Sequence, residues 1–146
     1  ADRYRMSDAT CTALQLTNHW QDVRRDLLER DRVYLPSEDT GITPDMLRDW
    51  ANRPNDPQAR VPYIKAIRSL VYRTWELFEQ GRPLPATLDP GIRPVVWLFG
   101  AGGERVLASI ERAGCVTLWK RPTLGAGAKA GLLARAWIRS RLARSR

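Results

Sequence analysis

The sequence predicts an all-α fold, and three of its features support that prediction. Apolar residues recur at steps of three and four over several stretches, the spacing that places side chains on one face of a helix. Clusters of proline and glycine separate these stretches, as turns do. No stretch shows the strict alternation of apolar and polar residues that is typical of a half-buried strand. We therefore expect helices joined by turns.

The first helix is expected over residues 4–29, a stretch without glycine or proline. It ends before Pro36, because a proline disfavours helical backbone in the residue that precedes it. Its apolar side chains recur at steps of three and four, so they share one face that can pack into a core. That face consists of Ala13, Leu16, Trp20, Val23 and Leu27.

Four further helices are predicted, at residues 44–52, 63–80, 94–113 and 126–143. The first of them begins with Thr43 as its N-cap and Pro44 in the first helical position, where proline is favoured. The second is the most regular amphipathic stretch of the chain and ends at Gly81. The connections are predicted as loops at residues 37–41, 53–62 and 82–91, and as an extended link at residues 114–122.

Length and composition set limits on the protein class. The 146 residues are enough for one domain or part of one, with a modest core. No apolar run approaches the roughly 20 residues that span a bilayer, and no signal peptide is recognised. The net charge of +8 leaves nucleic acid, an anionic membrane surface and a polyanionic substrate open as partners.

The basic excess gathers at the C-terminus, where eight Lys or Arg residues and no acid follow Trp119. One interpretation is a solvated basic helix, and the other is attraction to an anionic membrane, worth up to about 1 kcal/mol per basic residue. Nucleic-acid binding is disfavoured, because no recognised motif appears and the aromatic residues occupy core-like positions instead of alternating with basic ones.

Cysteine and histidine give no sign of a metal centre. Cys11 and Cys115 lack metal-ligand spacing and are expected to be buried thiols in a reducing compartment. His19, the only histidine, is expected to have a structural or helix-surface role, although an acid–base role stays open.

A polar stripe follows the first helix. Its members lie three, four and four residues apart and therefore stand above one another. Their amide and carboxylate oxygens suit Mg²⁺, which takes its remaining ligands from water and substrate phosphates. Two arginines follow, and guanidinium groups match phosphate geometry. The pattern is compatible with a metal-bridged diphosphate site made of Gln15, Asn18, Asp22 and Asp26, with Arg30 and Arg32 as its clamp.

The same pattern has a second interpretation. Asp22 and Asp26 could belong to an ordinary solvated helix face and pair there with Arg25 or Arg30. Spacing alone does not decide between a metal site and such a face, because short motifs often match by chance.

Residues 7–36, SDATCTALQLTNHWQDVRRDLLERDRVYLP, resemble the second aspartate-rich region of the squalene and phytoene synthase family. That pattern runs LQLxN, then QD or RD, then a further Asp, then GRxYLP. The Trp20-Gln21 pair is similar to the bacterial hydroxysqualene synthase branch of hopanoid biosynthesis. So is the stretch GGERVLASIERAGCVTLWKRPTL at residues 102–124.

The resemblance implies the C-terminal half of an isoprenoid-synthase helical bundle. Residues 1–146 would form the C-terminal part of a single domain, and the half with the first aspartate-rich motif is expected to be missing. It also implies Mg²⁺ as the cofactor. Asn18, Asp22 and Asp26 would bind the metal, and Gln15 and Arg32 would bind the substrate diphosphate.

The implied activity is that of a transferase or lyase acting on a prenyl diphosphate, namely Mg²⁺-dependent conversion of presqualene diphosphate to hydroxysqualene. The alternatives are head-to-head condensation of two farnesyl diphosphates to presqualene diphosphate or squalene, or a non-catalytic basic helical domain. The chain alone is expected to be inactive. Its expected location is the cytoplasm, with peripheral contact to the inner membrane and to other hopanoid-pathway enzymes, and without nucleic acid.

The chain departs from the family pattern at two places. Asp31 stands where the family has glycine, and Cys115-Val116 stands where it often has a Tyr-Asp pair. Arg121 matches the family's Arg-Pro and is expected to be a pocket or packing residue. Three glycines interrupt the helix at residues 94–113, which allows close approach either of a neighbouring helix or of an isoprenoid chain. They are Gly100, Gly102 and Gly103.

Overall fold

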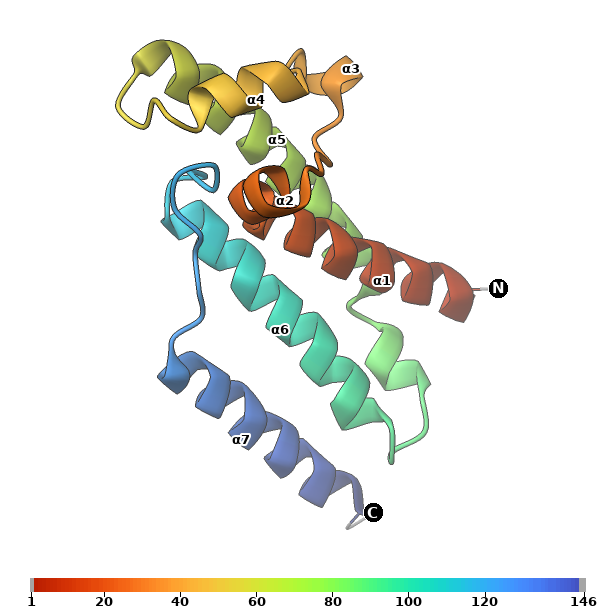
Figure 1. Ribbon diagram of the computed structural model, residues 1–146. Helices are drawn as coiled ribbons and strands as arrows, with labels where there is room; N and C mark the ends of the chain where they lie inside the picture. Colours follow the sequence, from red (N-terminus) through yellow and green to blue (C-terminus); the bar gives the residue numbers. More distant parts are fainter. Residues whose placement is uncertain (1, 145–146) are drawn as a thin grey trace.

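The computed structural model describes residues 2–144, with the side chains of residues 2–141 (Figure 1). Regular structure in this part of the chain is entirely helical, which confirms the predicted all-α fold. The helices are α1 (Asp2–Gln21), α2 (Val23–Arg30), α3 (Ser37–Thr40), α4 (Pro44–Trp50), α5 (Pro57–Gly81), the 3₁₀ helix η1 (Leu84–Thr87), α6 (Arg93–Arg112) and α7 (Ala126–Arg144).

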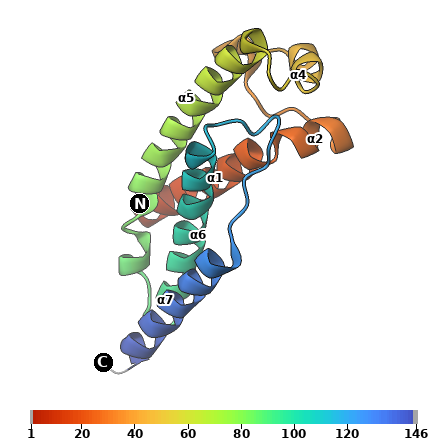
Figure 2. The ribbon, with the colours of Figure 1, turned by 90° about the vertical axis from the view of Figure 1, so that its left-hand side faces the viewer.

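Three long helices, α1, α5 and α6, form the centre of the molecule. Helix α1 packs against both α5 and α6, and α7 packs along α6 (Figures 1 and 2). The short helices α3 and α4 lie at the end opposite to the C-terminus (Figure 1). The core between the long helices contains fully buried apolar side chains from each of them, among them Ala13, Ile67, Val71, Leu107 and Ile110.

Close packing of α6 depends on one glycine. A Cβ atom at Gly103 would lie 2.5 Å from Cδ2 of Leu14 and 2.6 Å from Cζ of Phe78, so a larger residue would require these buried contacts to shift. Cβ atoms at Gly100 and Gly102 would meet nothing within 4 Å. Of the two explanations for these glycines, helix packing therefore holds for Gly103.

Two buried polar contacts tie the elements together. The indole Nε1 of Trp20 donates to Oγ1 of Thr74 over 2.9 Å, which fixes α1 to α5. The hydroxyl of Tyr63 lies 2.7 Å from Oγ1 of Thr117, which fixes α5 to the segment after α6. Burial raises the pKa of the Tyr63 phenol, so this hydroxyl stays protonated.

Several predicted boundaries were wrong. The single helix predicted at residues 4–29 is two helices with a bend at Asp22, although the backbone hydrogen bonds of Asp22 and Asp26 continue through the bend. Helix α5 begins six residues earlier than predicted, because Asp56 caps it by accepting from the N–H of Gln58 over 2.9 Å. Short helical turns, α3 and η1, occur within predicted loops.

The two thiols differ in exposure. Cys115 is buried as predicted, and burial raises the pKa of its thiol. Cys11 is exposed, so the prediction that it is buried was wrong. Its neighbours Thr10 and Ala13 face the core, and position 11 falls on the outer side of α1.

Candidate functional site

The residues of the polar stripe divide into an exposed pair and a buried pair. Gln15 and Asn18 are exposed on α1. Asp22 lies at the bend between α1 and α2, and Asp26 lies in the first turn of α2; each carboxylate side chain is only 8% exposed. Buried carboxylates require partners, because an unpaired charge is costly away from water. Arginines provide them.

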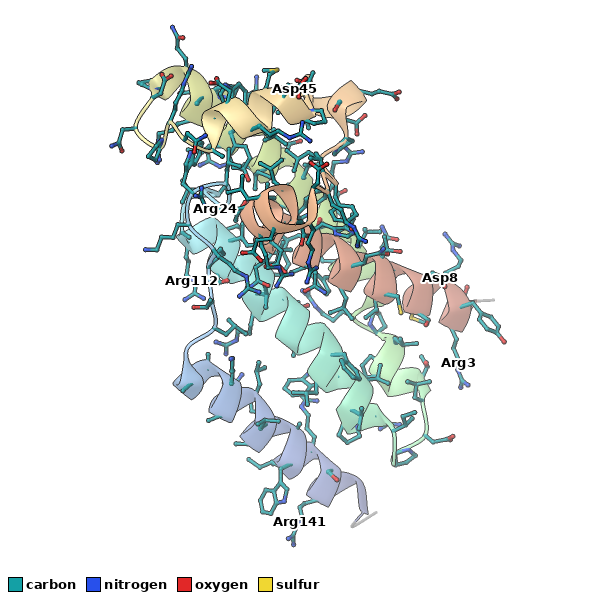
Figure 3. The ribbon with its side chains drawn as sticks, in the orientation of Figure 1. Arg3, Asp8, Arg24, Asp45, Arg112 and Arg141 are labelled. Carbon is teal, nitrogen blue, oxygen red and sulfur yellow. The ribbon has the colours of Figure 1, made fainter. Side chains whose placement is uncertain are left out.

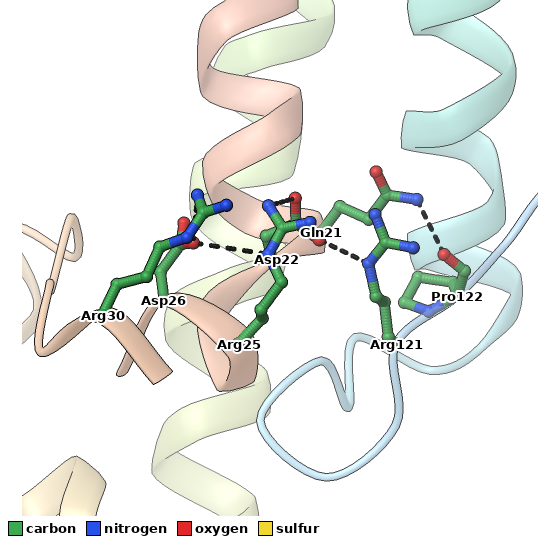
Figure 4. Close-up of polar contacts among 7 residues, drawn as sticks. All are labelled: Gln21, Asp22, Arg25, Asp26, Arg30, Arg121 and Pro122. Atoms are coloured by element: carbon green, nitrogen blue, oxygen red, sulfur yellow. Dashed lines mark hydrogen bonds and ion pairs between the residues drawn. The ribbon is translucent and has the colours of Figure 1, made fainter. Parts of the chain in front are cut away.

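Arginines hold both oxygens of Asp22 (Figure 4). The Nη2 group of Arg25, one turn along α2, donates to Oδ2. The Nε group of Arg121, in the loop between α6 and α7, donates to Oδ1. Arg121 therefore contacts a proposed metal ligand directly. This contact joins two parts of the chain that are far apart in sequence.

Asp26 shares one of these arginines. Its Oδ1 lies 3.3 Å from Nη1 of Arg30 and 3.6 Å from Nε of Arg25. The Nε atom of Arg25 is buried and has no hydrogen-bond partner. Arg25 thus lies between the two carboxylates with an unused donor. The alternative interpretation, in which Asp22 and Asp26 pair with Arg25 or Arg30, agrees with the observed ion pairs, but the carboxylates are buried and not on a solvated face.

The loop that provides Arg121 is fixed in place by neighbouring contacts. The amide Nε2 of Gln21 donates to the carbonyl of Pro122 over 2.8 Å (Figure 4). Nη1 of Arg24 donates to the carbonyl of Leu118 over 3.2 Å, and Nε1 of Trp119 donates to the carbonyl of Trp50 over 2.9 Å. The site therefore rests on an anchored loop.

The end of α2 explains the unusual acid at position 31. Asp31 has a left-handed backbone with φ of 52°, and its N–H donates to the carbonyl of Asp26. Its carboxylate accepts from Nη2 of Arg48 over 2.7 Å, and this bond raises the pKa of Arg48. Asp is among the few non-glycine residues that tolerate this conformation. Arg32 follows, exposed, and lines a small pocket together with Asp26.

His19 lines the same small pocket and packs on an aromatic side chain. Its ring stacks on Tyr34 with the ring centroids 3.8 Å apart. The contact joins α1 to the segment after α2, which is the structural role predicted for this histidine.

The site combines a few oxygen ligands with several positively charged arginine side chains. Within residues 2–141, no group of three or more His, Cys, Asp and Glu side chains is arranged to hold a metal. Two carboxylates and the Asn18 amide are a donor set that suits Mg²⁺ if water and phosphate oxygens supply the remaining ligands. The guanidinium groups of Arg25, Arg30 and Arg121 suit a phosphate-type anion.

An apolar groove begins on the same side of α1. It has a volume of about 790 Å³ and its lining includes Cys11, which lies one turn before Gln15. The remaining apolar lining comes from α1, η1, the segment after η1, and α6: Tyr4, Leu14, Leu84, Leu88, Val96 and Phe99. Such a lining suits a hydrocarbon chain.

None of the helices described is long and apolar enough to cross a membrane.

Figure 3 shows the side chains on these helices, with charged residues labelled on α1, α2, α4, α6 and α7. Helical spacing predicts Arg25 as a partner of the carboxylates but not as a bridge between both of them. From the family resemblance, Arg121 is expected as a pocket or packing residue, and no helical spacing reveals its bond to Asp22, which lies 99 positions away.

Comparison with known proteins gives two kinds of match. The sequence model for squalene/phytoene synthase matches residues 1–127. The hydroxysqualene synthase of Rhodopseudomonas palustris is 33% identical over 109 residues, which cover 74% of this chain and 36% of that protein. The hydroxysqualene synthase of Zymomonas mobilis is 33% identical over 86 residues, which cover 57% and 27% respectively. The chain thus spans about a third of the length of these relatives. No solved structure matches.

Proposed function

The chain belongs to the squalene/phytoene synthase family, and on that premise we propose that it provides part of a diphosphate site that converts presqualene diphosphate to hydroxysqualene. The observation that carries this proposal is the pair of buried carboxylates, Asp22 and Asp26, held by three arginines on one side of the molecule. Both relatives named above are hydroxysqualene synthases, which supports this reaction.

Asn18, Asp22 and Asp26 would hold Mg²⁺ together with phosphate oxygens of the substrate. The bound ion would neutralise the charge that develops on a departing diphosphate. Gln15 and Arg32 would contact the diphosphate from either end of the stripe. These assignments require Asp22 and Asp26 to exchange their arginine partners when substrate binds.

The arginines have a second role in this proposal. If Asp22 and Asp26 held the metal, the guanidinium groups of Arg25, Arg30 and Arg121 would lose their carboxylate partners. Phosphate oxygens would then replace the carboxylates as acceptors, since both present the same two-oxygen geometry. The unused Nε donor of Arg25 would gain a partner in the same event.

The apolar groove would hold an isoprenoid chain. Departure of the diphosphate leaves a carbocation, which requires an apolar environment and is stabilised by aromatic faces such as that of Phe99 in the groove lining. Formation of hydroxysqualene then requires that one water molecule reach this cation. Residues 2–141 supply two carboxylates for the metal, so we predict that the 146-residue chain by itself forms no product.

A second reaction stays in view, because the matching family includes squalene and phytoene synthases. It is the head-to-head condensation of two farnesyl diphosphates. A product assay on the protein expressed from its complete reading frame separates the two, with presqualene diphosphate and farnesyl diphosphate supplied separately, each with Mg²⁺ and with a chelator. Mg²⁺-dependent hydroxysqualene from presqualene diphosphate supports the proposal. Turnover of farnesyl diphosphate alone favours the condensation, and no turnover of either substrate by a folded protein refutes both.

A further inference from the structure

Arg48 connects the end of α2 to α4 through two carboxylates. Its Nη2 group donates to Oδ1 of Asp31 over 2.7 Å, and its Nη1 group donates to Oδ1 of Asp45 over 2.8 Å. Both amino groups of this guanidinium are therefore occupied. Leu47, the residue before Arg48, is fully buried and lines the small pocket that Arg32 also lines. These contacts thus lie at the edge of the candidate diphosphate site.

Arg32 differs from the other arginines of the site in having no carboxylate partner. The three arginines that hold the buried carboxylates are engaged with them. Arg32 is exposed, and its side chain forms no ion pair or hydrogen bond with any of residues 2–141. Its backbone N–H donates to the carbonyl of Asp26 over 2.8 Å, which holds the residue beside the stripe. Its guanidinium can therefore receive an outside anion without breaking a contact within the described chain.

The residue before Arg32 is an acid, and its charge opposes such an anion. The side chain of Asp31 is 81% exposed. An unpaired carboxylate at this position would repel a phosphate group and would offer Arg32 an intramolecular partner. The glycine that the family has here brings no charge. The bond from Arg48 removes the conflict, because the guanidinium neutralises the carboxylate and occupies one of its oxygens.

We propose that Arg48 is a positioning residue that occupies Asp31 and so keeps the Arg32 guanidinium free for an outside anion. The inference rests on the proposed function, in which Arg32 contacts the substrate diphosphate. The same contacts could instead be only a structural link between α2 and α4. A structural link is lost when either Asp31 or Arg48 is replaced. Neutralisation requires Arg48 only while Asp31 is present, so replacing both residues should restore the site.

The test compares three variants of the complete protein, namely Arg48→Gln, Asp31→Gly and the double variant with both changes. Glycine tolerates the left-handed backbone of position 31, with φ of 52°, so the turn after α2 is kept. Titration calorimetry with inorganic pyrophosphate and Mg²⁺ gives the affinity. Arg48→Gln should weaken binding about fivefold, the effect of one exposed charge near a multivalent anion. Asp31→Gly and the double variant should bind at least as tightly as the unmodified protein.

A second measurement needs no ligand. Phenylglyoxal reacts with the deprotonated guanidine group, a form that a neighbouring carboxylate disfavours. In Arg48→Gln, the free carboxylate of Asp31 should slow the modification of Arg32 about threefold. The double variant should return this rate to that of the unmodified protein. Mass spectrometry of Arg32 gives the rate, which depends on the protein's own side chains and not on a substrate.

Arg53→Gln is the matched control. The side chain of Arg53 is 42% exposed, against 45% for Arg48, and it too pairs with two carboxylates. Its Nη1 lies 3.1 Å from Asp49, and its Nη2 lies 2.6 Å from Asp56. Its replacement should leave both the pyrophosphate affinity and the modification rate of Arg32 unchanged. Circular dichroism checks that every variant is folded.

Three results would overturn the inference. The first is an unchanged modification rate of Arg32 in Arg48→Gln, which would show that Asp31 does not compete for this guanidinium. The second is weaker pyrophosphate binding in Asp31→Gly without recovery in the double variant, which would leave only a structural link between α2 and α4. The third is unchanged pyrophosphate affinity in Arg48→Gln although Arg32→Gln lowers it.

Failure of the proposed function gives a different result. If the modification rates change as expected, but Arg32→Gln binds pyrophosphate like the unmodified protein, the role of Arg48 toward Asp31 is supported. The contact of Arg32 with a diphosphate is then refuted.

Discussion

Arg121 donates its Nε–H to Oδ1 of Asp22, although the two residues lie 99 positions apart in the sequence (Figure 4). The contact connects the loop between α6 and α7 to the bend between α1 and α2. The candidate site is therefore formed only when the chain is folded, and the loop belongs to it as much as the aspartate-rich helix does. Predictions about the site follow from this connection.

Replacing Arg121 with Gln should affect binding more than stability. The Arg121 side chain is 44% exposed, so loss of its ion pair should lower the free energy of unfolding by less than about 1 kcal/mol. Affinity for inorganic pyrophosphate with Mg²⁺ should fall about tenfold, because one charge-assisted donor is removed. Urea denaturation and calorimetric titration of the complete protein measure the two effects.

The control for Arg121 is Arg73→Gln, which breaks the exposed pair between Arg73 and Asp39, 2.9 Å apart. The Arg73→Gln variant should lower the free energy of unfolding by as much as Arg121→Gln does, and it should leave the affinity for pyrophosphate unchanged. If both variants bind pyrophosphate equally well, Arg121 has no part in the diphosphate site.

Replacing Arg25 with Met should strengthen Mg²⁺ binding in the absence of diphosphate. Arg25 lies within ion-pair distance of both Asp22 and Asp26 and competes with a metal for them. Its removal should tighten Mg²⁺ binding about tenfold, a difference of about 1.4 kcal/mol. Titration calorimetry with Mg²⁺ alone gives this number. An unchanged or weaker affinity would show that the carboxylates do not bind the metal.

Replacing Gly103 with Ala should destabilise the protein by about 1–3 kcal/mol, because the added methyl group collides with Leu14 and Phe78. The control Gly102→Ala has open space around the new methyl group and should be neutral or stabilising by up to about 1 kcal/mol. Denaturant unfolding compares them directly. Equal stability of the two variants would contradict the close approach of α6 to α1 and α5.

The two thiols should react at very different rates. Cys11 is exposed in the apolar groove, whereas burial at Cys115 raises its pKa and lowers its thiolate fraction at any given pH. A maleimide should modify Cys11 in the native protein and Cys115 only after unfolding. Farnesyl diphosphate should protect Cys11 if the groove holds an isoprenoid chain. If maleimide modifies Cys11 equally fast in saturating farnesyl diphosphate, the isoprenoid chain binds outside this groove.

Much of the fold could be predicted because helix periodicity is a local property. The predicted helices at residues 94–113 and 126–143 agree with α6 and α7 to within one residue at each end. The bend at Asp22 could not be predicted, since no glycine or proline marks it. The early start of α5 had a signal in Asp56 and Pro57, which the later Pro62 obscured.

The candidate site divides in the same way. The spacing from Gln15 to Asp26 can be seen in the sequence, but the bend at Asp22 and the burial of Asp22 and Asp26 cannot. The pairing of Asp22 with Arg121 depends on tertiary packing, which spacing does not encode. The backbone is left-handed at position 31, where the family has glycine, and Asp31 adopts this conformation while its carboxylate binds Arg48.

The central claim is that Asp22 belongs to a diphosphate site, and the most direct test is product formation by the Asp22→Asn variant of the complete protein. Asn keeps the shape of the side chain and removes its charge. With presqualene diphosphate and Mg²⁺, we predict that hydroxysqualene formation falls about a hundredfold or more. Asp39→Asn, which changes an exposed carboxylate outside the site, should keep full activity. Undiminished hydroxysqualene formation by a folded Asp22→Asn protein would contradict the account.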